Sequence, residues 1–285
     1  ITAVNGDITV NPCSPGDPLA VTLISGSQMN ANNGNIRFSN INGGGTISVT
    51  GPGNVGTNPN GQISFGDGVT PNTVTMNVNR AVGAVSGVGT TTNVTTATGD
   101  LKVGPFDSTL AATFTANGVG ANITTAGNIT AGGVLTLDAG TGNASVVVNA
   151  NNDLQGSAVT LVSGTGANAF VSVANGADIT ATTGNVSITT PILNMNPTGF
   201  AETNSINATL GSITITQPNA AALVVNMDTN SSINATNAGQ DITFNGTGIT
   251  MNNAGGGLIN ANDLVALNGA GGAVSVNVDR INGSI

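Results

Sequence analysis

The apolar residues of the chain recur in short alternating runs, and the runs themselves recur at a nearly constant distance. The segment SINATLGSITI at 205–215 is followed by SINATNAGQDITF at 232–244. In each copy two runs of alternating apolar and polar residues flank a turn that contains a glycine. A period of two residues is typical of a β-strand that buries one of its faces. The pattern therefore predicts pairs of short strands joined by a tight corner.

The same sequence pattern recurs over the whole chain at intervals of about 28 residues. The first apolar position after the glycine reads Ile8, Ile36, Ile63, Leu101, Ile129, Val159, Val186, Ile213, Ile242 and Val265. A row upstream of it reads Ile1, Met29, Val55, Val94, Ile123, Val148, Ile179, Ile206, Ile233 and Ile259. The one long interval, from Ile63 to Leu101, predicts a loop insertion at 66–92, and the proline-rich segment 11–18 predicts a second loop.

A third alternating run often lies between these two, so each unit is expected to hold three short strands and no helix. One such unit cannot bury its own inward residues, whereas a neighbour on each side buries them and pairs its backbone groups. The sequence therefore predicts an all-β parallel β-helix, or β-solenoid, of about ten coils of about 28 residues. Residues 1–285 are expected to form a single solenoid. Because the repeat runs in phase to both ends, we expect further coils of a longer chain, or a second subunit, to stack there.

A polar residue stands beside the glycine in most units, and two roles are open for this row. Stacked side chains of this kind form hydrogen-bonded ladders along a solenoid, but they also line ligand-binding surfaces. The row comprises Asp7, Asn35, Gln62, Asp100, Asn128, Asn185, Ser212 and Asp241.

Composition narrows the possible functions. Only 6% of the 285 residues are charged, the net charge is −9, and Arg37, Arg80, Lys102 and Arg280 are the only basic residues. Nucleic-acid binding needs a basic surface, so we expect none, and no apolar run is long enough to insert into a membrane. The single cysteine, Cys13, forms no internal disulfide. It is expected to be inert or packed, or to crosslink to another molecule.

Catalytic chemistry is not expected. The thirteen acidic residues are spread singly and histidine is absent, so paired carboxylates or an acid–base histidine are not visible. Glycine runs such as GGGTISV lack the aspartate of calcium-binding repeats. We therefore predict no enzyme and no catalytic, cofactor-binding or metal-binding residue. The Asn-x-Ser/Thr sequons arise readily from this composition, and glycosylation stays an alternative; examples are Asn93, Asn122, Asn185, Asn207 and Asn234. Thr-x-Thr, as at Thr214 and Thr216, is not sustained from unit to unit, which argues against ice binding.

The segments GGVLTLDAGTGNASVVV at 132–148, NGADITATTGNVSIT at 175–189 and LGSITIT at 210–216 resemble the coils of filamentous-haemagglutinin-type exoproteins and autotransporter passengers. The resemblance is one of repeat style and covers the whole chain. It implies a right-handed β-helix that is exported and used for adhesion, surface coating or as a stalk.

Together these features predict an extracellular or cell-surface structural protein that forms a filament, sheath or fibre by end-to-end stacking and can be adhesive. A carbohydrate-binding adhesin, or a tailspike-like recognition protein that binds surface glycans, is the alternative. Such a protein would be expected to carry a groove with aromatic residues, whereas several of the seven Phe fall in inward rows. A polysaccharide-degrading β-helix enzyme is the third and least favoured interpretation.

Overall fold

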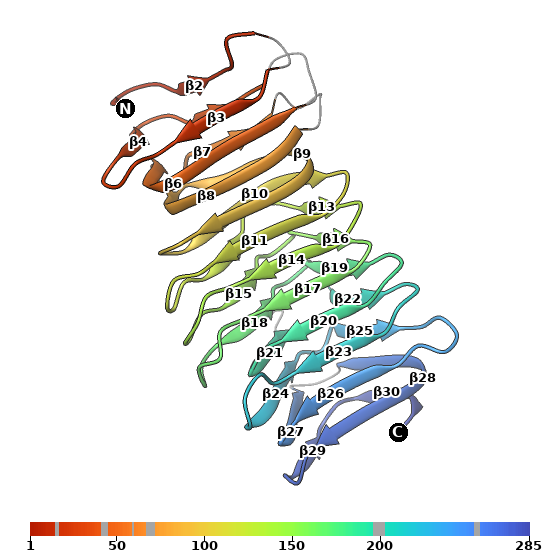
Figure 1. Cartoon of the computed structure of the whole chain (residues 1–285). Helices are drawn as coiled ribbons and strands as arrows, with labels where there is room; N and C mark the ends of the chain where they lie inside the picture. Colours follow the sequence, from red (N-terminus) through yellow and green to blue (C-terminus); the bar gives the residue numbers. More distant parts are fainter. Residues whose placement is uncertain (15–16, 41–44, 59, 67–71, 196–202, 254–256) are drawn as a thin grey trace.

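The computed structural model describes residues 1–285 except 15–16, 41–44, 59, 67–71, 196–202 and 254–256. Within the described residues every strand pairing is parallel, and the chain winds as a β-solenoid (Figure 1). The predicted fold class is thus confirmed, with about ten turns, although a turn averages about 26 residues rather than 28. The right-handed winding stays a prediction.

The strands lie on three faces, which the chain visits in the constant order face 3, face 1, face 2. Face 1 comprises β2 (Ile8–Val10), β5 (Ile36–Phe38), β7 (Gln62–Phe65), the start of β9 (Ala84–Thr96), the end of β10 (Leu101–Ser108), β13 (Ile129–Ala131), β16 (Leu154–Gly156), β19 (Asp178–Ala181), β22 (Asn204–Ala208), β25 (Ser231–Ala235), the start of β28 (Leu258–Gly269) and β30 (Arg280–Ser284).

The other two faces are built in the same way. Face 2 comprises β3 (Leu19–Thr22), the start of β6 (Thr46–Thr57), the start of β8 (Asn72–Val82), the end of β9, β11 (Ala112–Ala116), β14 (Leu135–Asp138), β17 (Val159–Val162), β20 (Val186–Thr189), β23 (Ile213–Thr216), β26 (Ile242–Gly246) and the end of β28. Face 3 comprises β1 (Thr2–Ala3), β4 (Gln28–Ala31), the ends of β6 and β8, the start of β10, β12 (Ile123–Thr125), β15 (Val146–Val148), β18 (Phe170–Val173), β21 (Ile192–Met195), β24 (Ala222–Met227), β27 (Gly248–Asn253) and β29 (Val274–Val276).

The interior is a narrow stack of aliphatic side chains, one layer per turn. Val186, Ile213 and Ile242 are vertical neighbours on face 2, and each is 0% exposed. The interior also holds phenylalanine: Phe38 and Phe65 stack with ring centroids 5.3 Å apart, and Phe114 and Phe244 are buried in later turns. This buried placement confirms that phenylalanine falls in inward rows and supplies no aromatic groove at these positions.

The predicted rows hold in segments but change face along the chain. Ile8, Ile36 and Ile63 do stack, on face 1, whereas Val159 and its successors stack on face 2. Leu101 instead pairs with Ile123 on face 3, a vertical contact that neither predicted row contains. The repeated sequence pattern fits every corner of the solenoid. Where the length of a turn varies, equivalent positions of the pattern therefore fall on different faces.

The interval from Ile63 to Leu101 contains a turn of its own, so the insertion predicted at 66–92 is wrong over the described residues. Val85 in β9 pairs with Ile63 of the preceding turn and with Val103 of the following turn. Val103 lies where β10 passes from face 3 to face 1, and it also pairs with Thr125 of face 3. This turn escaped detection because β8 leads into β9 through Gly83 with hardly any loop. Gly83 has φ +110°, and a Cβ there would lie 2.1 Å from Thr57 Oγ1, so the corner requires glycine. In the other predicted loop, residues 11–14 and 17–18 lie between β2 and β3 and form no strand.

Candidate functional site

The polar row forms hydrogen-bonded ladders in which a side-chain oxygen accepts from a backbone amide one turn further along. On the approach to face 1, Asp7 Oδ1 accepts from the N–H of Asn35 at 2.8 Å, and Asn35 Oδ1 accepts from the N–H of Gln62 at 2.9 Å. The ladder therefore satisfies amides at the corner, where the sheet pairing stops.

Three further ladders follow the same rule on the approaches to the other strands. Their acceptor–donor pairs are Asp100–Asn122 and Asn122–Ser145 before face 3, Asn128–Asp153 and Asp153–Asp178 before face 1, and Asn185–Ser212, Ser212–Asp241 and Asp241–Leu264 before face 2, with distances of 2.8–3.1 Å. Of the two open roles for this row, the structural one is confirmed. The members lie in four ladders rather than one, and the bonds run from backbone to side chain.

A second kind of ladder joins outward asparagine amides in the later turns. On face 3, Asn226 donates to Asn194 Oδ1 at 2.8 Å and Asn252 donates to Asn226 Oδ1 at 3.0 Å. On face 1, Asn234 donates to Asn207 Oδ1 at 2.8 Å. Asn207 and Asn234 are two of the sequons, so a glycan on either would stand inside this ladder.

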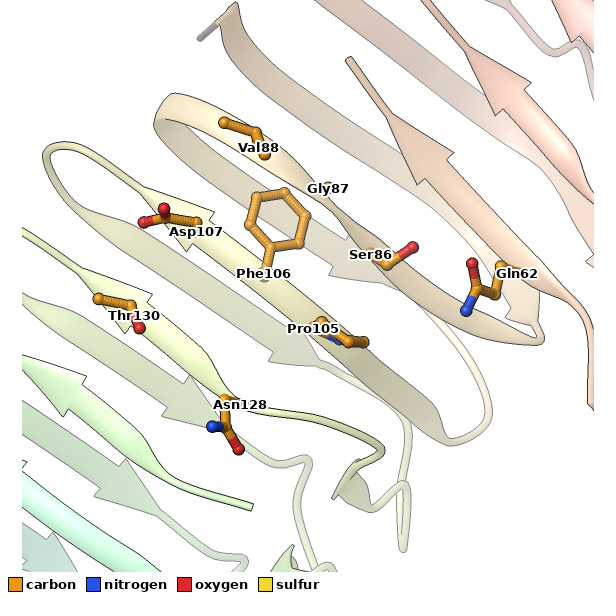
Figure 2. A pocket seen from close by; sticks show the side chains of 9 residues that line it. All are labelled: Gln62, Ser86, Gly87, Val88, Pro105, Phe106, Asp107, Asn128 and Thr130. Carbon is orange, nitrogen blue, oxygen red and sulfur yellow. The ribbon is translucent and has the colours of Figure 1, made fainter. Parts of the chain in front are cut away.

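A surface depression lies where the stacking of face 1 is interrupted. The pairing of β10 with β9 shifts register between Val103 and Phe106, across Gly104 and Pro105. The bulge leaves an open depression of about 460 Å³ on the outer surface (Figure 2), lined by Gln62, Ser86, Gly87, Val88, Pro105, Phe106, Asp107, Asn128 and Thr130.

The phenylalanine of this depression points mostly into the core. Phe106 is 3% exposed and meets Phe114 edge-on, with ring centroids 5.4 Å apart. The depression therefore offers the amides of Gln62 and Asn128 and the carboxylate of Asp107 beside the Pro105 ring. Ser86 and Thr130 add hydroxyls. This set can hold a small polar molecule by hydrogen bonds, but it presents no aromatic platform for a sugar ring.

Two of the basic residues line a second depression. Arg80 and Lys102, from the corner between faces 3 and 1, line a depression of about 260 Å³ together with Asp100. Arg37 lies elsewhere, on the outside of β5 between Thr9 and Ser64. Asp100 stands beside the two cations, so this depression is not a purely cationic site.

Among the carboxyl groups, Asp138 of β14 differs from the rest. It lies half-buried on the outside of face 2 between Thr115 and Val162. Burial raises the pKa of this carboxyl, because the charged form loses part of its hydration. Cys13 is exposed and forms no disulfide.

Within the described ranges, no group of three or more Asp, Glu, His or Cys side chains is arranged to hold a metal ion. In the same part of the chain no helix has the length and apolar character to cross a membrane. The depression at the β10 bulge had no sequence signal of its own, although the Gly104–Pro105 pair that creates it is visible.

The fold and the ladders define a parallel β-solenoid in which the turn is the repeated unit. Comparison of the chain with protein-family models, curated proteins and solved structures found no match.

Proposed function

We propose that the chain is a structural segment of an extracellular, cell-surface fibre, in which the solenoid itself is the functional element. The observation that carries the proposal is the parallel pairing that links successive turns on faces 1 and 2 throughout the described residues, and on face 3 except between β8 and β10. Such a stack transmits load along backbone hydrogen bonds and leaves few exposed strand edges for proteases. The extracellular location rests on the resemblance of the repeats to exported β-helices.

The turn that contains β29 supports stacking as the mode of assembly. Val274 and Val276 of β29 are 44% and 38% exposed, whereas Ile249 and Met251, their partners one turn below, are 0% and 1% exposed. These valines occupy inward positions, so a further turn placed on β29 would bury them. Burial of these valines, together with backbone pairing, would stabilise an end-to-end contact.

Imaging of native particles tests the proposal. A fibre with an axial repeat of about 4.8 Å is the expected result. A discrete particle of fixed length, such as a trimeric spike, would overturn the structural role in favour of a recognition protein.

A pair of variants separates stacking between chains from a longer chain that supplies its own further turns. Val276→Lys places a charge on the end face, and Ser275→Lys places the same charge on the outer surface of the same strand. If copies of this chain stack, sedimentation velocity will show concentration-dependent association in the Ser275→Lys variant and loss of it in Val276→Lys. Equal behaviour of both variants would contradict stacking between copies.

An adhesive role for the fibre is the second candidate, favoured by the depression at the β10 bulge. Its volume of about 460 Å³ and its mixed amide, hydroxyl and carboxylate lining fit one or two sugar units. Glycan-array binding that Asp107→Asn weakens would support this role. Binding unchanged by Asp107→Asn would place the adhesive site elsewhere.

A further inference from the structure

The pairing of successive turns on face 3 is broken between β8 and β10. Within the described residues, β8 pairs with β6 of the preceding turn and β10 pairs with β12 of the following turn, but no pairing joins β8 to β10. Just before this break, the Thr98 N–H donates to the Asn79 carbonyl oxygen at 2.8 Å. Pairing between the two turns resumes on face 1, where Ala84 is the partner of Lys102.

The break results from a difference in conformation and not from a difference in length. Val78 pairs with Thr96 and Ala84 pairs with Lys102, so the two turns have the same number of residues between these points. The first turn crosses most of this interval as the strand β8, whereas the following turn bends at residues 97–100. A straight segment beside a bent one leaves a gap between the two turns.

This gap is an open depression of about 260 Å³, and two of the four basic residues of the chain line it. We call it the basic depression. Arg80 lies in β8 on one side, and Lys102 lies in β10 on the other. A Cβ added at Gly99, in the bend of the following turn, would lie 3.2 Å from Arg80 Nε. The Arg80 side chain therefore reaches across the gap toward the turn that carries Lys102.

The two cations are not neutralised by carboxylates of the chain. Within the described part of the chain, neither Arg80 nor Lys102 forms a salt bridge or a side-chain hydrogen bond. Asp100 lines the same depression, but its Oδ1 accepts from the Asn122 backbone N–H at 2.8 Å and from Asn122 Nδ2 at 3.1 Å. This carboxylate is therefore engaged with the following turn. Two cations and one carboxylate leave a positive charge here, in a chain whose net charge is −9.

An arginine and a lysine that share a small depression suit a carboxylate or sulfate group. The guanidinium presents parallel N–H donors that match two oxygens of such a group, and the ammonium adds a compact charge with three donors. A volume of about 260 Å³ admits one such group together with part of the molecule that bears it.

The basic depression borders the depression at the β10 bulge. Gln62 and Lys102 are the partners of Ala84 in the preceding and the following turn. The residue that follows each of these three is 0% exposed, so the three side chains themselves point outward. Gln62 lines the depression at the β10 bulge, and Lys102 lines the basic depression. A ligand that occupies both needs a negative group next to neutral hydroxyl groups, and an acidic sugar chain has both.

From these observations we propose that the basic depression binds the carboxylate or sulfate group of an acidic polysaccharide, with Arg80 and Lys102 as the contacting residues. The adjoining sugar unit would lie against Gln62 and Pro105 in the depression at the β10 bulge. This inference deepens the adhesive role proposed above and rests on it. The closely spaced phosphates of a nucleic acid would be repelled by the net charge of −9.

Isothermal titration of the intact chain with polygalacturonate and with dextran sulfate tests the proposal, and neutral dextran is the control polymer. Arg80→Gln and Lys102→Gln each remove one positive charge from the basic depression. Arg37→Gln is the matched control, because it removes the same charge from the outside of β5, between Thr9 and Ser64. Circular dichroism and thermal unfolding would verify that all three variants fold.

The wild-type chain is expected to bind at least one of the acidic polymers and not dextran. Arg80→Gln and Lys102→Gln should each weaken this binding by about tenfold or more, because each removes a charge-assisted hydrogen bond. Arg37→Gln should change it by less than about twofold. The polymer that binds more tightly assigns the charged group to a carboxylate or a sulfate. No binding of either acidic polymer, or an equal loss in Arg37→Gln, would overturn the proposal, as would duplex DNA bound as tightly as the polymers.

The basic depression and the wider adhesive role fail in different ways. Glycan binding that Asp107→Asn weakens and Lys102→Gln leaves unchanged would keep the adhesive role and overturn the anionic site. Binding of an acidic polymer that Lys102→Gln weakens and Asp107→Asn leaves unchanged would support the anionic site and locate adhesion at the basic depression alone.

Discussion

Replacement of Ile213 by alanine tests how strictly each turn depends on its neighbours. Ile213 is 0% exposed and lies between Val186 below and Ile242 above, in a column with no polar atom. Loss of a buried Ile side chain to Ala costs about 2–5 kcal/mol, depending on how far the surroundings collapse into the space. Here the hydrogen bonds between turns hold the backbones about 4.8 Å apart. We therefore expect a cost in the upper half of that range, about 3.5–5 kcal/mol.

Amide hydrogen exchange is the suitable assay, because a repeat structure need not unfold in one step and the chain contains no Trp or Tyr for fluorescence. Protection should fall most in β20, β23 and β26, which share the cavity, and least in the distant β2 and β5. The control is Thr214→Ala, one residue along the same strand and directed outward, with an expected change within about 0.5 kcal/mol. Equal loss in the two variants, or uniform loss along the whole chain, would refute the reasoning.

Three other substitutions probe separate features. Asn122→Ala removes the acceptor of the 2.8 Å bond from the Ser145 N–H and should lower the unfolding free energy by about 0.5–1.5 kcal/mol in urea titrations. Asp138→Asn removes a carboxyl group whose pKa is raised by burial. The stability of the wild-type chain therefore falls as the pH rises from the ordinary carboxyl pKa through the raised one. The variant should lack this fall, so its melting temperature should be higher than that of the wild-type chain at neutral pH but not in acid. Gly140→Ala places a Cβ 1.9 Å from the carbonyl oxygen of Gly118, one turn away, and should lower stability by about 1–3 kcal/mol; an unchanged melting temperature would contradict this contact.

The architecture was predictable because two periods in the sequence have a direct physical meaning. Alternation at two residues reports which side of a strand faces inward, and recurrence at the turn length reports what stacks on what. Ile206 and Ile233, taken from the repeated phrase, are indeed vertical partners. The polar row before the strands was also recognisable, since only a short oxygen-bearing side chain can reach the amide of the next turn.

The face on which each strand lies was not predictable, because the same sequence pattern fits every corner of the solenoid. Val94 was placed with Val55 and Ile123, but it stacks between Met76 and Phe114 on face 2. A short turn through Gly83, with no loop to mark it, shifted the alignment of all the residues that follow.

The central claim is that each turn adds one step along a common axis. Distances measured between turns test this claim most directly. Spin labels can be placed at Thr75 and Thr243, and in a second sample at Thr113 and Thr243, after Cys13→Ser removes the native thiol. Along face 2 the first pair is separated by seven steps and the second by five. The backbone separations should therefore be about 34 Å and about 24 Å, and the measured difference about 10 Å. Equal distances in the two samples, or distances that do not scale with the number of turns, would contradict the stacked solenoid.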